Sequence, residues 1–277
     1  MVLTTIKIKK EISQTFRIAS PLIIAAVATI VLEMVDTMML GWLGKRQIAG
    51  GALVNAGYLF MCATSAGLFT ALGVSVAYAI GAGQREKIAA LVDASVWIAL
   101  GLSLPVVLGM YYCADMFAWA GQPQEILQYT RDYAHYYAWG LPAVLLFYVC
   151  REILAGLSRP AIIMWVCFFA IPLNVLGNYL LMYGQWGLPV MGVSGIALST
   201  VIVTWLMVFV MFLYIKTHYH FREYGLFVSW PKLALHHVSP LLRLGGPAAF
   251  SFGFESSLFA LTAILMGYFG TVSLASH

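Results

Sequence analysis

Long apolar stretches alternate with short polar ones along the whole chain. Seven of the apolar stretches are long enough to cross a bilayer, because about 20 apolar residues span its hydrocarbon core as a helix. The predicted spans are residues 18–41, 51–80, 88–113, 135–157, 161–183, 196–215 and 241–270. Polar turns such as 81–87 and 121–125 separate neighbouring spans. The pattern predicts an all-α fold, a polytopic bundle of membrane helices.

The composition supports this class. The 277 residues are 62% hydrophobic and only 9% charged, whereas soluble domains have roughly 25% charged residues. Motifs of soluble enzymes, such as a Walker loop or HExxH, are absent, so we predict a protein that is not an enzyme. Four isolated cysteines indicate no metal site or disulfide. We expect no cofactor, no nucleic acid partner, and membrane lipid as surroundings.

The distribution of Lys and Arg predicts the orientation, because cytoplasmic segments carry an excess of these residues. One side of the predicted membrane carries three of them: Lys45, Arg46 and Arg131. The other side carries twelve: Lys7, Lys9, Lys10, Arg17, Arg85, Lys87, Arg151, Arg159, Lys216, Arg222, Lys232 and Arg243. The N-terminus is therefore predicted to be cytoplasmic. Residues 1–16 form a basic cytoplasmic leader, 17–215 hold six spans, and 216–240 form a cytoplasmic linker before the seventh span in 241–277.

Two carboxylates interrupt the first span. An acid near the bilayer centre costs about 2.5–3.5 kcal/mol on insertion scales, so it normally faces the interior of a bundle and has a function. Glu33 and Asp36 are three residues apart, which places both on one face of the helix. Asp36 lies about 7.5 Å below the outer end of its span, at 1.5 Å per residue. No Lys or Arg within a span is expected to neutralise it.

Amides on the fifth span lie at a similar depth. Asn178 is five residues before the outer end of that span, and Asn174 is one turn further in on the same face. The first and fifth spans can therefore present Asp36, Asn174 and Asn178 to one another. Such oxygen ligands suit a proton or a hard cation such as sodium. The alternative is that both amides only hold the helices together by hydrogen bonds. Glu255, in the seventh span, is a further candidate cation or proton site.

An internal repeat relates the first and seventh spans. A shift of 226 residues superposes Arg17 on Arg243 and Pro21 on Pro247, and it aligns two glycines and an alanine further along. Six spans lie within one period. Because this number is even, both copies cross the membrane in the same direction, as in a parallel repeat.

Motifs throughout the chain resemble those of the MATE multidrug efflux transporters, within them the NorM-type bacterial branch. The matching segments are Pro21 followed by VDTMMLGWLG, then GAGQREK, REILAGLSRP, IPLNVLGNYLLMYG, GVSGIALST, RLGGP and the pair Phe254–Glu255. The resemblance implies twelve helices in two six-helix lobes, a bacterial inner-membrane location, and exchange of cationic amphiphilic drugs for protons or sodium. It carries over a role in cation or proton binding to Asp36, Asn174, Asn178 and Glu255.

The sequence departs from the family pattern in two ways. Glu33 does not belong to that pattern on the first helix. The five helices after the seventh are absent, so the chain reads as one lobe plus the first helix of a second, and the missing lobe would be its partner. Two alternatives to an antiporter stay open. One is a lipid-linked oligosaccharide flippase, which would need a strongly basic cavity, and the other is an inert structural fragment.

Overall fold

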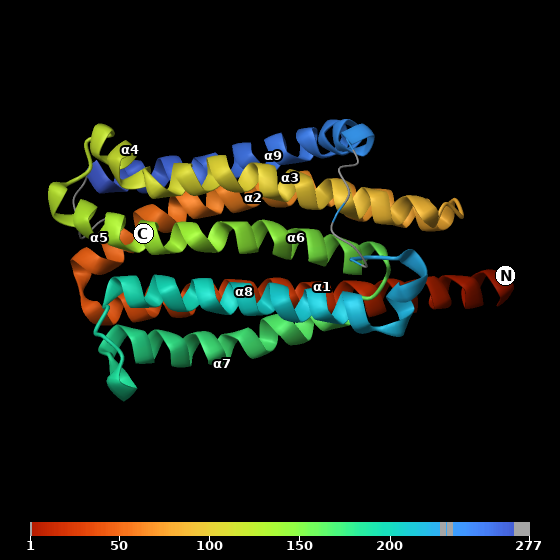
Figure 1. The fold of residues 1–277 in the computed structure, drawn as a ribbon, viewed down its shortest axis with the longest axis horizontal. Coiled ribbons are helices and arrows are strands. Elements are labelled where there is room, and N and C mark those ends of the chain that lie inside the picture. Colours follow the sequence, from red (N-terminus) through yellow and green to blue (C-terminus); the bar gives the residue numbers. More distant parts are fainter. Residues whose placement is uncertain (1, 228–230, 232–234, 269–277) are drawn as a thin grey trace.

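The computed structural model is a bundle of long, roughly antiparallel helices (Figure 1). It describes residues 2–227, 231 and 235–268. No strand occurs among these residues. The helices, in chain order, are α1 (Val2–Leu43), α2 (Lys45–Gly81), α3 (Glu86–Tyr111), α4 (Cys113–Trp119), α5 (Gln124–Tyr137), η1 (Ala138–Gly140), α6 (Leu141–Gly156), α7 (Ala161–Tyr183), η2 (Gln185–Gly187), α8 (Val193–Thr217), η3 (Tyr219–Tyr224) and α9 (Leu235–Tyr268).

The predicted number of membrane spans agrees with the structure. Seven helical segments in the described residues are long and apolar enough to cross a membrane. The fold class predicted from the sequence, an all-α membrane bundle, is thereby confirmed. α1 and α9 run in the same direction (Figure 1), as the parallel repeat requires.

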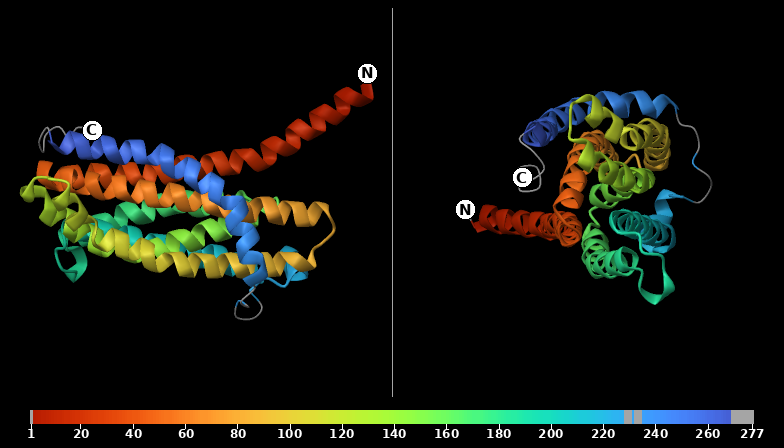
Figure 2. Two further views of the ribbon diagram at one scale, coloured as in Figure 1. Left: turned by 90° about the horizontal axis from the view of Figure 1, so that it is seen from above. Right: turned by 90° about the vertical axis from the view of Figure 1, so that its left-hand side faces the viewer.

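Several helices begin or end away from the predicted limits. The leader is not a separate segment, because α1 is a single helix from Val2 and its first part projects beyond the bundle (Figure 2). The fourth span was predicted from residue 135, but helix begins at Gln124 with the polar α5. α4 was not predicted, and α9 begins at Leu235 rather than at 241. The predicted end of the seventh span, at 270, lies outside the described residues.

Small residues bring the helices into close contact. Gly195 of α8 lies against α7, where an added Cβ would be 2.7 Å from the backbone of Leu181. Gly177 of α7 lies in turn against the side chain of Ser199 on α8. Small residues let membrane helices approach closely where no hydrophobic effect drives them together. This contact places the polar residues of α7 and α8 within hydrogen-bonding distance of one another.

The apolar core consists of two main clusters along the bundle. One contains Phe69 and Met211, and the other contains Leu40 and Leu53. Tyr148 of α6 packs against both clusters. A cavity lies where the clusters meet, and polar side chains from α1, α2, α6 and α8 converge on it.

Candidate functional site

Asp36 lies at the meeting point of α1, α7 and α8. Its side chain is only 3% exposed. Asn178 of α7 donates a hydrogen bond from Nδ2 to Asp36 Oδ1 at 2.7 Å. Thr200 of α8 donates from Oγ1 to Asp36 Oδ2 at 2.6 Å. The structure thus brings Asp36 and Asn178 together, at the shared depth that helix geometry predicted.

Asn174 completes a ring of four side chains with these three residues. Its Oδ1 accepts a hydrogen bond from Asn178 Nδ2 at 3.2 Å, and its Nδ2 donates to Thr200 Oγ1 at 3.0 Å. All four side chains are buried or partly buried. Asn174 therefore orients both residues that donate hydrogen bonds to Asp36.

Two features of the hydrogen bonding in this ring suit the binding of an ion. Asn178 Oδ1 is buried and has no hydrogen-bond partner among the described residues. Thr200 has one hydroxyl proton, yet it lies within reach of two acceptors, Asp36 Oδ2 and the backbone oxygen of Ile196 at 3.2 Å. A bound proton or cation could interact with Asn178 Oδ1, and it could change the acceptor to which the Thr200 hydroxyl donates.

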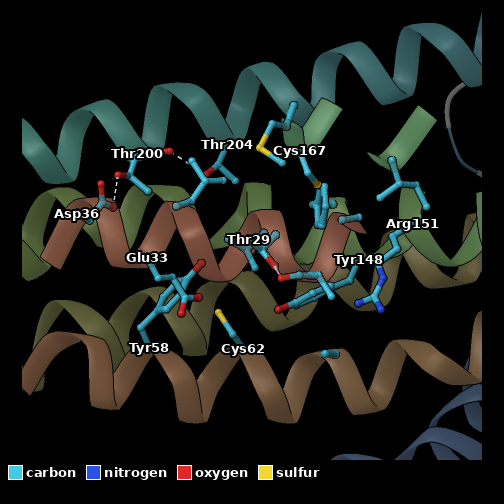
Figure 3. A pocket seen from close by; sticks show the side chains of 18 of the residues that line it. Thr29, Glu33, Asp36, Tyr58, Cys62, Tyr148, Arg151, Cys167, Thr200 and Thr204 are labelled. Carbon is cyan, nitrogen blue, oxygen red and sulfur yellow. Dashed lines mark hydrogen bonds between the residues drawn. The ribbon is translucent and has the colours of Figure 1, made fainter. Parts of the chain in front are cut away.

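The ring borders a cavity of about 210 Å³. Asp36 and Thr200 lie at one end of it, and Arg151 of α6 lies at the other (Figure 3). Four aromatic side chains also line the cavity: Tyr58, Tyr137, Phe147 and Tyr148. The α1 residues that line it extend from Ala25 to Asp36, which is about 16 Å of helix at 1.5 Å per residue.

Glu33 lies one turn from Asp36 and lines the same cavity. Its side chain is exposed, unlike that of Asp36, so the cavity opens to the outside of the lobe at this residue. Figure 3 shows it directed toward Tyr58 of α2. The cavity therefore presents one buried carboxylate within a hydrogen-bonded ring and a second, accessible one near its mouth.

Glu255 is separate from this site. It lies on an exposed face of α9 and is not among the cavity-lining residues. The opposite side of the same turn, at Gly253 and Ser256, is buried. The structure thus places Glu33 and Asp36 on one cavity, joins Asn174 and Asn178 to Asp36 in a hydrogen-bonded ring, and leaves Glu255 on the outside of the described part of the chain.

Two residues of the cavity were not predicted from the sequence. Thr200 is a hydroxyl residue in an apolar span, and only the register of α7 against α8 shows that it meets Asp36. Arg151 was assigned to the cytoplasmic side, near the end of its span. It lies five residues before the end of α6 at Gly156, and it also lines the cavity.

Residues 21–180, more than half of the chain, match the family described as MatE. The chain belongs to the MATE family. MATE proteins are transporters, which confirms the prediction that this protein is not an enzyme. The chain is 33% identical over 272 residues to the probable multidrug resistance protein NorM of Synechocystis sp., covering 96% of this chain and 58% of that protein. It is 32% identical to the multidrug resistance protein NorM of Aliivibrio fischeri, with 97% and 58% covered.

Solved MATE structures share the fold. The eukaryotic MATE transporter AtDTX14 superposes with a TM-score of 0.85 at 20% identity, covering 93% of this chain and 56% of that one. The MATE multidrug transporter DinF-BH gives a TM-score of 0.84 at 17% identity, with 95% and 58% covered. This chain therefore corresponds to a little over half the length of the MATE proteins that it matches.

Proposed function

We propose that the chain forms the ion-binding lobe of a secondary active multidrug efflux antiporter, which exports organic cations in exchange for protons or sodium ions. The observation that carries this proposal is the buried Asp36 carboxylate at one end of a cavity. It has hydrogen-bond donors around it but no Lys or Arg paired with it among the described residues. An uncompensated buried carboxylate is costly, so it takes up a proton or a cation.

The residues around Asp36 suit either coupling ion. For a sodium ion, the carboxylate and the unpartnered Asn178 Oδ1 offer oxygen ligands within one ring. For a proton, a protonated Asp36 could donate to Thr200 Oγ1, which would then donate to Ile196. Both ions would change the same contacts among α1, α7 and α8.

Coupling requires that the ion favour one arrangement of the helices over another. Pro21 in α1 and Pro172 in α7 interrupt the helical hydrogen bonding near the cavity and are the places where these helices could bend. An organic cation would bind at Glu33, whose carboxylate is accessible. Ion binding at Asp36 would then weaken cation binding one turn away, both by charge and by changing the packing of α1.

Localisation and partners follow from this role. We assign the chain to the bacterial inner membrane as a multi-pass protein with a cytoplasmic N-terminus. Its substrates would be cationic amphiphilic molecules. A second lobe would be its partner, since the NorM relatives are longer than this chain. Glu255 would face that lobe, because it is exposed on α9.

The test is Asp36→Asn in a protein that carries this lobe together with a second one. The amide keeps the shape of the side chain and can still hydrogen-bond to Asn178 and Thr200, but it can neither titrate nor supply a full negative charge. We expect normal membrane insertion and loss of ethidium efflux from energised vesicles, with partial activity in Asp36→Glu. Wild-type efflux by Asp36→Asn between about pH 6 and 8 would show that the acid is structural and that the proposal is wrong.

A further inference from the structure

A groove on the outside of the lobe runs between α3 and α8. α6 lies between these two helices (Figure 1) and forms the floor of the groove, where Val149 and Cys150 are buried. Leu100 of α3 and Phe209 of α8 line its sides and are exposed. The groove has a volume of about 520 Å³, and none of the described residues that line it also lines the Asp36 cavity. It is therefore a separate pocket that opens toward the bilayer.

The length of the groove matches one leaflet of a bilayer. Five residues of α8 line it at spacings of three and four, so they lie on one face of that helix: Trp205, Val208, Phe209, Phe212 and Lys216. From Trp205 to Lys216 the helix rises about 16 Å at 1.5 Å per residue. Trp205 is the central residue of α8, and Lys216 lies in its last turn. Because the hydrocarbon core is about 30 Å thick, each leaflet contributes about 15 Å. The groove thus extends from the membrane surface to the bilayer centre.

A single cation stands at the surface end of this apolar groove. Lys216 is the one charged residue among the described residues that line it. Its Nζ lies 5.9 Å from the centroid of the Phe212 ring, within the range of a cation–π contact. Lys216 forms no ion pair with a described residue, because the ion pairs found there join Arg46, Arg85 and Arg131 to other acids. The ammonium group is therefore held beside the groove without a protein counter-ion.

Two residues that follow α8 complete the lining. The Phe227 ring packs against Phe212, with ring centroids 4.8 Å apart. Pro231 is held by α3, since Trp97 Nε1 donates a hydrogen bond to the Pro231 backbone oxygen at 3.2 Å. Both lie in the groove wall. The segment after α8 thus closes the groove against α3 next to the Lys216 ammonium group.

These features indicate the chemistry of the occupant. Apolar walls that open to the bilayer suit an acyl chain, and basic pockets between membrane helices bind anionic lipid head groups. A cationic amphiphile would be repelled by Lys216. We propose that the groove binds one anionic phospholipid, with its phosphate on Lys216 and an acyl chain along α8 as far as Trp205. In the proposed orientation this lipid belongs to the cytoplasmic leaflet. The site is independent of Asp36 and its cavity.

The experiment compares two lipids that differ in the charge of the head group. The purified 277-residue chain in detergent is mixed with equal amounts of phosphatidylglycerol and phosphatidylethanolamine that carry the same acyl chains, and the first bound lipid is identified by native mass spectrometry. We expect about a fivefold preference for phosphatidylglycerol, which corresponds to about 1 kcal/mol for one basic residue near the membrane surface. Lys216→Gln should abolish the preference, and Lys216→Arg should keep it. Arg159→Gln is the matched control, because Arg159 is exposed after α6 and does not line the groove.

A second pair of variants tests the acyl-chain part of the site. Leu100→Trp should fill the groove and reduce binding of both lipids severalfold. Leu104→Trp is its control, since Leu104 lies one turn further along α3, is exposed, and does not line the groove. Phosphatidylglycerol with butyryl chains has the same head group without a long chain, so it should compete poorly. All the substituted side chains are exposed, and circular dichroism verifies that each variant keeps its helix content.

Three outcomes would overturn the proposal. One is equal binding of the two long-chain lipids by the wild type, and another is an unchanged preference in Lys216→Gln. The third is that Leu100→Trp binds as the Leu104→Trp control does, or that the butyryl lipid competes as well as the long-chain lipid. This last result would mean that a phosphate binds at Lys216 without any use of the groove. Efflux that depends on Asp36 would be unaffected by all three.

Discussion

At the scale of residues, most hydrogen bonds in the ring of Asp36, Asn174, Asn178 and Thr200 are fixed. The exception is the hydroxyl proton of Thr200, which has two possible acceptors. Three of the four residues are amides or acids whose hydrogen bonds are fixed by the ring, and Thr200 supplies the adjustable hydroxyl. It accepts from Asn174 and can donate either to Asp36 or to Ile196. The Thr200 hydroxyl therefore has two possible acceptors, and the charge on Asp36 decides between them.

Loss of the Thr200 hydroxyl should accordingly impair transport. Thr200→Val removes a donor to a carboxylate, and such bonds contribute roughly 1.5–3 kcal/mol, about a tenfold to hundredfold effect. We expect efflux in a two-lobe protein to fall by at least tenfold, whereas Thr200→Ser should retain most of it. Ser103→Ala is the control, since the Ser103 hydroxyl bonds only to Ala99 in its own helix, α3. The measurement is the initial efflux rate per amount of protein in the membrane, and unchanged efflux in Thr200→Val would exclude this role.

Sequence reasoning could predict part of this ring. The depth of Asp36 and Asn178 follows from a fixed rise per residue, so their proximity was predictable once the span ends were known. Thr200 was not, because the rotation of α8 against α7 is set by the contacts of Gly195 and Gly177. Arg151 was missed for a different reason: a basic residue near a span end looks like a topology signal whether it points to water or into a cavity.

At the scale of elements, the glycines of α9 determine how it lies on α2. Gly245 lies against the backbone of Leu68, and Gly67 of α2 lies against the backbone of Ala248. A Cβ at Gly253 would be 3.6 Å from the Cβ of Thr64. These three close approaches, all between Thr64 and Leu68 on α2, fix the rotation and the register of the pair where the helices meet.

This register predicts an engineered disulfide. Cβ atoms about 3.5–4.5 Å apart are suited to a disulfide, so Thr64→Cys combined with Gly253→Cys should cross-link on mild oxidation once the four natural cysteines are replaced. Adding Gly67→Leu should reduce cross-linking severalfold, because the larger side chain forces α2 and α9 apart. Gly57→Leu is the matched control on α2, since no heavy atom lies within 4 Å of a Cβ there. Failure to cross-link in the parent pair, measured by gel mobility, would contradict this packing of α9.

Element limits were predictable only where the sequence contains strong stop signals. The fifth span was predicted at 161–183 and is found there, between Pro160 and Gly184, which has a left-handed conformation with φ of 67°. α5 was missed because it is amphipathic and polar, with Ile126, Leu127 and Tyr133 buried on one face only. A hydropathy criterion detects helices that face lipid on most sides. Where a helix extends past the bilayer, the span predicted by this criterion begins too late in the sequence.

At the scale of the whole molecule, one side of the lobe remains apolar and uncovered. In the end-on view of Figure 2, α1 and the later part of α9 lie on the same side of the bundle. Both helices carry large exposed apolar residues, among them Met34 and Met38 on α1 and Phe254 and Leu258 on α9. In a membrane protein such a surface contacts lipid or another lobe, and the exposed Glu255 within it favours contact with protein over hydrocarbon.

The orientation of the whole molecule is the remaining sequence prediction that an experiment can settle. Twelve Lys and Arg on one side against three on the other predict a cytoplasmic N-terminus. Lys45, at the start of α2, and Lys87, in the first turn of α3, are both exposed and lie at opposite ends of the bundle. In a cysteine-free background, Lys45→Cys should react with an impermeant maleimide added to intact spheroplasts, whereas Lys87→Cys should react only after the membrane is opened. Lys45→Cys leaves twelve basic residues against two, and Lys87→Cys leaves eleven against three, so neither variant should change the orientation itself. Labelling of Lys87→Cys but not of Lys45→Cys from outside would mean that the chain has the opposite orientation in the membrane. The Arg151 end of the cavity would then lie toward the outside, and the proposed direction of drug export would have to be abandoned.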